Sequence, residues 1–152
     1  MTSPSAKLQA LGIALRKPGA PAASYVMAVS TGSTVFLSGH IAKKEGQVWV
    51  GKLGENMDTA SGKEAARSVA IDLLSTLQDH LGSIDRVKRV VKVMGLVNST
   101  SSYTEQHLVI NGCSELINEV FGDAGKHARS AFGVAQIPLG SCVEIEMIVE
   151  IE

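Results

Sequence analysis

The chain has 152 residues, of which 45% are hydrophobic and 19% are charged, and its formal net charge is −1. This length suits one domain, predicted over residues 1–152, and the composition supports a packed core and excludes a disordered chain. The near-neutral charge argues against a duplex-binding protein, since such proteins carry a basic excess or a basic stripe. The densest basic spots, Lys43-Lys44 and the cluster from Arg86 to Lys92, are expected to be solvated surface.

The beginning of the chain is polar and shows no signal peptide, and no apolar run approaches the ~20 residues needed to span a bilayer. Cys113 and Cys142 show neither a CxxC motif nor a paired spacing. Both are therefore expected to be free, buried thiols in a reducing compartment. We predict a cytoplasmic protein with no membrane partner.

Hydrophobic periodicity predicts three helices and six strands. In chain order they are a short helix at 5–12, strands at 25–29, 34–38 and 47–50, a helix at 58–81, a strand at 89–97, a helix at 103–121, and strands at 130–137 and 143–151. Ser61 and Glu64 have capping-box spacing at the start of the first long helix, although Asp58 or Thr59 could cap it instead. The order β-β-β-α-β-α-β-β is typical of an α+β layer protein.

Several predicted strands carry apolar residues on both faces. Phe36 lies opposite Val35 and Leu37, and the strand at 89–97 places Val90, Met94 and Leu96 opposite Val91 and Val93. Two long helices can cover only one face of a sheet, so the apolar residues of the second face would be exposed to solvent in a monomer. This pattern predicts a homo-oligomer.

Arg129 and Glu144 are the candidate chemical groups. Arg129 opens a strand among small residues, and its guanidinium fork matches a carboxylate, although a strand-opening arginine is most often a surface or ion-paired residue. Glu144 and Glu146 share the acidic face of the last strand and could activate a water, or could simply form a solvated edge. A hairpin about 139–140 would hold Arg129 ~20 Å from Glu144 at ~3.3 Å per residue. Either the last two strands are not neighbours, or the two residues meet across a subunit boundary.

No metal or nucleotide cofactor is indicated. The four histidines, His40, His80, His107 and His127, show none of the HxH, HxxxH or HExxH spacings of metal sites. Gly62-Lys63 looks like a fragment of a phosphate-binding loop, but Glu64 stands where serine or threonine belongs.

From about Tyr25 to the C-terminus, the chain resembles the RidA/YjgF family of reactive-intermediate deaminases. The residues that carry the resemblance are Tyr25-Val-x-Ala-Val29, Phe36-Leu-Ser-Gly-His-Ile41, Asn111, Ala128-Arg-Ser130, Pro138 and Val143-Glu-Ile-Glu146. The spacing of Arg-Ser, Pro and Glu-Ile-Glu is the specific part. The N-terminal segment and the long loop at Asn98 look like a divergent branch of the family.

The resemblance implies a chorismate-mutase-like two-layer sandwich, with a mixed sheet of about six strands and two long helices on one face, and a homotrimer with clefts between subunits. It also implies cofactor-independent hydrolysis of 2-imino or enamine acids to 2-oxo acids and ammonia. Arg129 would clamp the substrate carboxylate, and Glu144 would orient or activate water. The residues implied to line the substrate-binding pocket are Tyr25, Ser38, Gly39, Asn111 and Ala131.

Three positions depart from the family pattern: Met27 and His40 stand where glutamine is frequent, and Ala131 stands where cysteine is usual. A backbone contact survives Ala131, but a sulfur contact does not. Two alternative functions stay open. One is a non-catalytic trimer that binds a small carboxylate at Arg129. The other is the endoribonuclease or translation-inhibitor activity often attached to this family, which ranks last because the few aromatic residues offer no visible stacking platform for RNA.

Overall fold

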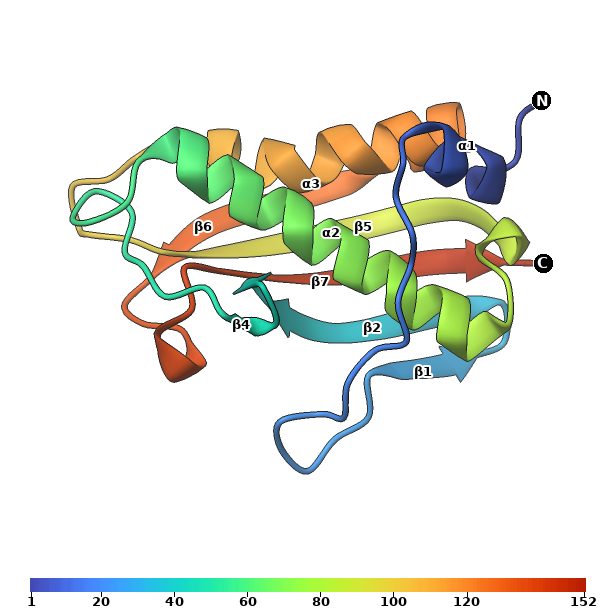
Figure 1. Cartoon of the computed structure of the whole chain (residues 1–152), viewed down its shortest axis with the longest axis horizontal. Helices are drawn as coiled ribbons and strands as arrows, with labels where there is room; N and C mark the ends of the chain where they lie inside the picture. The colour runs from blue at the N-terminus through green and yellow to red at the C-terminus, as the bar shows by residue number, and fades with distance from the viewer.

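The computed structural model describes all 152 residues and has the predicted α+β architecture. Figure 1 shows the two long helices lying across one face of a sheet, with both chain termini at the same end. The elements are α1 (Pro4–Ala10), β1 (Ala28–Thr31), β2 (Thr34–Ile41), β3 (Lys43–Lys44), β4 (Gln47–Val48), α2 (Thr59–Leu81), β5 (Val87–Asn98), α3 (Gln106–Phe121), β6 (Ala128–Val134) and β7 (Val143–Ile151).

The main sheet has five strands in the order β1-β2-β7-β5-β6, where about six were expected. The predicted strand at 47–50 does not join it, because β4 pairs only with the unpredicted β3 to form a separate two-stranded ribbon. The first strand begins at Ala28 and not at Tyr25. Its pairing with β2 ends at the Ala28–Leu37 pair, since β2 is irregular at the next two residues, Ser38 and Gly39.

The long helix α2 follows the predicted boundaries closely. Of the capping alternatives, Asp58 is the N-cap, and its Oδ1 accepts the Ser61 N–H at 2.8 Å. Gly82 ends the helix in the left-handed conformation, with φ +81°. Its apolar stripe, which includes Ala65, Val69, Leu73 and Leu77, is fully buried against the sheet and α3.

The central strand β7 alternates strictly between buried and half-buried residues, which confirms one dry face and one acidic face. Its neighbour β5 departs from simple alternation. Val90 and Val93 are both fully buried beneath the helices, while Val91 is 40% exposed, so Val90 does not share a face with Met94 and Leu96 as predicted. The register against β7 shifts between Val90 and Lys92, and this bulge reverses the alternation.

The last two strands are not neighbours, because β5 lies between β6 and β7. β6 runs parallel to β5 at the edge of the sheet, and α3 supplies the crossover that a parallel pair requires. The hairpin that would have separated Arg129 from Glu144 along one ladder therefore does not form. Of the two alternatives that the sequence left open, the one in which the last two strands are not neighbours is therefore confirmed.

The face of the sheet away from the helices carries large apolar side chains. Val29, Phe36 and Phe132 are 52%, 46% and 44% exposed on this open face. Both cysteines are free and buried, as predicted. None of the helices combines the length and the apolar composition that a membrane-spanning segment needs.

Candidate functional site

Arg129 is held by α3. Its Nη1 donates to the Asn111 Oδ1 at 2.8 Å and to the Ser114 Oγ at 3.2 Å, and its Nη2 donates to the His107 carbonyl at 3.1 Å. Three of the five guanidinium N–H groups are thus occupied, and the Nε–H and one Nη2–H remain for a ligand. We call Arg129, Asn111, Ser114 and the His107 carbonyl the α3 half-site.

His127 supports the α3 half-site through Ser114. The Nε2 of His127 lies 2.9 Å from the Ser114 Oγ, and the same hydroxyl contacts Arg129. Ala131, two residues after Arg129 on the same side of β6, packs against the hydrophobic core. These contacts fix the guanidinium before any ligand arrives, which lowers the entropy lost on binding an anion.

Glu144 belongs to a second group of predicted residues on the open face. It lies in a hollow of about 130 Å³ whose lining residues are Gly39, Met94, Leu96, Glu144 and Glu146. A side chain at Gly39 would begin only 3.0 Å from the Glu144 Cδ, so the backbone of β2 lies directly against the carboxyl group. We call Ser38, Gly39, Glu144 and Glu146 the bulge half-site.

Ser38 links the bulge to the segment before β1. Its N–H donates to the Met27 carbonyl at 2.9 Å, and its Oγ donates to the Val26 carbonyl at 2.6 Å. Tyr25 precedes this anchored pair and is 44% exposed. Predicted residues Tyr25, Ser38, Gly39 and Glu144 are therefore associated with one half-site, and Asn111, Arg129 and Ala131 with the other.

The pKa of Glu144 is raised above its ordinary value. Partial burial disfavours the carboxylate, and the negative charge of Glu146 adds to the effect. A carboxyl group with a raised pKa holds a proton more readily at neutral pH and so suits general acid–base chemistry.

The two half-sites of one chain lie on opposite faces of the sheet. Arg129 is in register with Val93, which is buried beneath the helices, whereas Glu144 is in register with Leu96 on the open face. Two strand spacings and three residues separate their Cα atoms, about 14 Å at ~4.8 Å per strand and ~3.3 Å per residue. One chain alone cannot place both groups on one small substrate.

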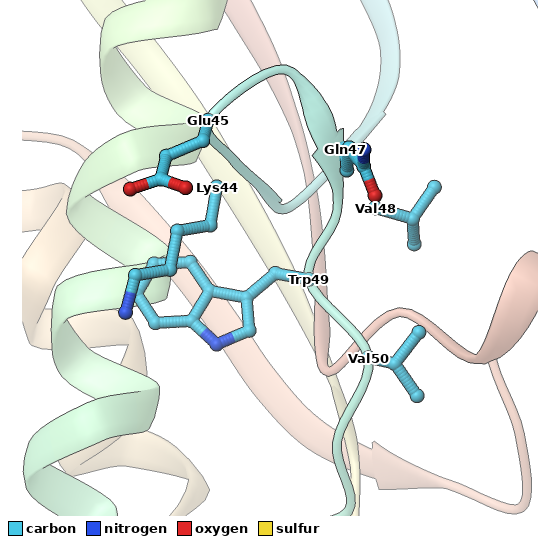
Figure 2. Close-up of a pocket in the computed structure, with 6 residues that line it drawn as sticks. All are labelled: Lys44, Glu45, Gln47, Val48, Trp49 and Val50. Atoms are coloured by element: carbon cyan, nitrogen blue, oxygen red, sulfur yellow. The ribbon is translucent and has the colours of Figure 1, made fainter.

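A larger hollow, of about 340 Å³, lies on the β3–β4 ribbon away from both half-sites. Figure 2 shows Lys44 lying along the Trp49 ring, with its Nζ 4.8 Å from the ring centroid. The other lining residues are Glu45, Gln47, Val48 and Val50. None of the predicted site residues lines it, so size alone does not mark the reactive centre here.

Sequence reasoning missed one residue that contacts Arg129 and one that contacts His40, the residue after Gly39. Ser114 on α3 contacts Arg129, and Thr76 on α2 lies 2.7 Å from the Nε2 of His40. Helical spacing offered a signal for Ser114, because it lies three residues after Asn111 and so on the same side of the helix. No local signal identified Thr76.

Comparison with known proteins finds similarity over nearly the whole chain. Residues 5–151 match the family described as "YjgF/chorismate mutase-like, putative endoribonuclease". Protein TCP17 of Trypanosoma cruzi is 46% identical over 149 residues, which cover 97% of this chain and 93% of that protein.

Solved structures agree with this result. A crystal structure described as a putative endoribonuclease from Shewanella oneidensis superposes with a TM-score of 0.93 at 27% identity, covering 98% of this chain and 99% of that one. RidA from an Antarctic Psychrobacter bacterium superposes with a TM-score of 0.57 at 27% identity, covering 89% of this chain and 94% of that one. The fold resembles the first structure more closely than it does the second.

Proposed function

The chain belongs to the YjgF/RidA family, and on that premise we propose that it hydrolyses reactive 2-imino and enamine acids to 2-oxo acids and ammonia. The observation that carries the proposal is the guanidinium of Arg129, which is fixed on α3 and retains two unpaired N–H groups. Such a group is preorganised to bind the carboxylate that every 2-imino acid carries.

The site is completed between two copies of the chain. The α3 half-site of one copy meets the bulge half-site of its neighbour, so each contact joins two different surfaces. Contacts of this kind close into a ring when the rotation between copies allows it. The homotrimer implied by the family resemblance is such a ring, and its assembly would cover the exposed Phe36 and Phe132.

In this arrangement Arg129 holds the substrate carboxylate while Glu144 faces C2. Starting from the iminium form, Glu144 accepts a proton from water as the water oxygen bonds to C2 and the C=N electrons move to nitrogen. The amine of the carbinolamine then takes that proton back, and the C–N bond breaks with its electrons going to nitrogen. The hydroxyl proton passes to the departing ammonia as the C2 carbonyl forms, which leaves a 2-oxo acid and an ammonium ion.

The remaining residues position the substrate. Asn111 keeps its amide N–H groups beside Arg129, because its Oδ1 is the atom that accepts from the guanidinium. Tyr25, Ser38 and Gly39 line the opposite wall, and Ala131 leaves room beside Arg129. The substrate is already electrophilic, so positioning supplies much of the acceleration and no cofactor enters the scheme.

A coupled assay that generates 2-aminoacrylate in situ tests the proposal. Ammonia release by the wild type should exceed the buffer rate and should fall at least ~100-fold in Arg129→Ala, as expected when a substrate clamp is lost. Arg67→Ala removes an exposed arginine of α2 and should leave the rate unchanged. Wild-type turnover at the buffer rate would contradict the proposal.

The same half-site geometry also serves a non-catalytic carboxylate-binding trimer. Saturable binding of a 2-oxo acid that is lost in Arg129→Ala, without any turnover, would favour this second function. The relatives named as endoribonucleases prompt one further measurement, the affinity for single-stranded RNA. Affinity that falls steeply with salt would favour that activity, since phosphate contacts release counterions.

A further inference from the structure

The β2 strand contains a bulge at the bulge half-site. Leu37 pairs with Met147 and His40 pairs with Ile145, so three steps along β2 correspond to two along β7. Ser38 and Gly39 form the irregular stretch, and Gly39 lies against the Glu144 carboxyl group. Bulges re-aim side chains and backbone groups, and here the backbone beside the carboxyl group is that of Gly39.

His40 lies behind this peptide, on the helix-covered side of the sheet, and is only 6% exposed. Its Nδ1 lies 2.6 Å from the Ser38 carbonyl oxygen, and its Nε2 lies 2.7 Å from the Thr76 Oγ1. A carbonyl only accepts, so the Nδ1 carries the proton and donates it, and the Thr76 hydroxyl donates to the Nε2. Burial and the charge of Lys43 lower the pKa of His40, which favours this neutral form.

The imidazole therefore ties the Ser38 carbonyl to α2. Every peptide bond in the chain is trans, so the Ser38 C=O and the Gly39 N–H point in opposite directions from one rigid plane. With the carbonyl held by His40, the plane of the Ser38–Gly39 peptide is fixed, and so is the position of the Gly39 backbone that lies against Glu144.

We propose that His40 is a positioning residue that anchors the Ser38 carbonyl to Thr76 and thereby holds the Gly39 peptide against Glu144. The role rests on the deaminase function proposed above, for which Glu144 is the acid–base group. Without the hydrogen bond from His40 the Ser38–Gly39 peptide can rotate. The Glu144 carboxyl group then loses the backbone contact that fixes its distance from C2 of the substrate. His40 itself does not touch the substrate.

Four variants separate positioning from simple packing. His40→Leu keeps the volume and removes both hydrogen bonds. His40→Asn keeps a donor that can reach the Ser38 carbonyl, because the asparagine amide nitrogen occupies nearly the place of the Nδ1. Thr76→Val keeps the shape of Thr76 and leaves the Nε2 unpaired. His80→Asn is the matched control, since His80 is an exposed histidine of α2 that contacts Ser30 and neither half-site.

The variants are compared at a temperature at which each is fully folded. We expect kcat to fall tenfold to a hundredfold, about the effect of a small misplacement, in His40→Leu and less in Thr76→Val, with KM changed by less than about threefold. His40→Asn should restore most of kcat, and His80→Asn should match the wild type. A second readout is the pKa of the Glu144 carboxyl, followed by ¹³C NMR and assigned with Glu144→Gln, which should differ from the wild type in His40→Leu.

Folded His40→Leu with wild-type kcat and an unchanged Glu144 titration would overturn the proposal. So would a His40→Asn variant that is no better than His40→Leu. If His40→Leu does not fold, Thr76→Val and His40→Asn decide by the same two readouts. If the wild type itself hydrolyses no imine, the deaminase function fails, and the NMR titration alone decides whether His40 positions Glu144.

Discussion

The two half-sites are built in different ways. In the α3 half-site, side chains hold a side chain: Arg129 is fixed by Asn111, Ser114 and a helix carbonyl. In the bulge half-site the backbone does this work, because the Gly39 peptide lies against Glu144 and no cation neutralises the two carboxylates. One half-site has a positive charge without an anion, and the other has excess negative charge. Each half-site therefore carries the charge that the other lacks.

The strongest test of this comparison is a mixture of two inactive variants. Arg129→Ala and Glu144→Gln should each lose at least ~100-fold in kcat/KM, because each removes one of the two chemical groups. If the site is shared between copies, mixed rings contain some sites with both native residues. Unfolding and refolding the two variants together at equal amounts should restore roughly a quarter of the wild-type activity, the fraction expected for random assembly into a closed ring.

Refolding each variant alone is the control, and neither should recover. A mixture that stays as inactive as its components would show that Arg129 and Glu144 act within one chain or not together.

A second prediction concerns the support of the α3 half-site alone. Gly112 neighbours Asn111 where α3 crosses α2, and a Cβ there would meet the Lys63 carbonyl oxygen at 1.9 Å. Gly112→Ala must push the helices apart, at a cost of about 3 kcal/mol for overpacking, or roughly 10 °C in Tm for a chain of this size. Calorimetry measures the change. Gly19→Ala is the control, because that loop position has open space around it.

The bulge half-site should be less affected by the same change. Below the Tm of Gly112→Ala, affinity for a 2-oxo acid should fall, while the titration of Glu144 stays close to that of the wild type. Equal disturbance of both properties would show that the half-sites are not separate units.

A third prediction isolates one contact of Arg129. Asn111→Ala removes the acceptor at 2.8 Å and should raise KM about tenfold, the usual worth of a hydrogen bond to a charged group, with a smaller change in kcat. Steady-state kinetics measure both. Asn118→Ala, at an exposed position of the same helix, should behave as the wild type. A fall in kcat at constant KM would instead place Asn111 at the reacting carbon.

The smallest expected effect concerns the charge of Glu146. Because its carboxylate helps to raise the pKa of Glu144, Glu146→Gln should lower that pKa. Glu144 is then deprotonated, and active as a base, at lower pH, so the acid limb of the kcat/KM profile should move to lower pH. Glu150→Gln is the control, since Glu150 lies further along the same face and pairs with Lys88. A shift to higher pH would exclude Glu144 as the base.

The periodic parts of the fold were predictable from the sequence. The alternation of Val143 to Ile151 and the apolar stripe of α2 can both be recognised in the sequence, and each forms a single buried face in the structure. The irregular parts were not. The bulge at Ser38–Gly39 and the shift at Val90 depend on pairing with β7, which is distant in sequence. The glycine in β2 was the one local signal of irregularity.

The candidate site was predictable as a set of residues but not as an arrangement. The family pattern identified Arg129, Asn111, Gly39 and Glu144, and the structure brings the first pair together and the second pair together. That the two pairs lie on opposite faces follows from the registers on β5, where Arg129 pairs with Val93 and Glu144 pairs with Leu96, and no local pattern encodes these registers. His40 and Thr76 are 36 residues apart, and only the packing of α2 on β2 joins them.

The burial of the two cysteines determines the reactivity of their thiols. Burial raises the pKa of Cys113 to about 12 and that of Cys142 to about 11. At pH 7 at most roughly one thiol in ten thousand is ionised, and only the thiolate is strongly nucleophilic. Under the deaminase function proposed above, the substrate therefore meets no ionised cysteine on the protein, and thiol alkylation should not inactivate it.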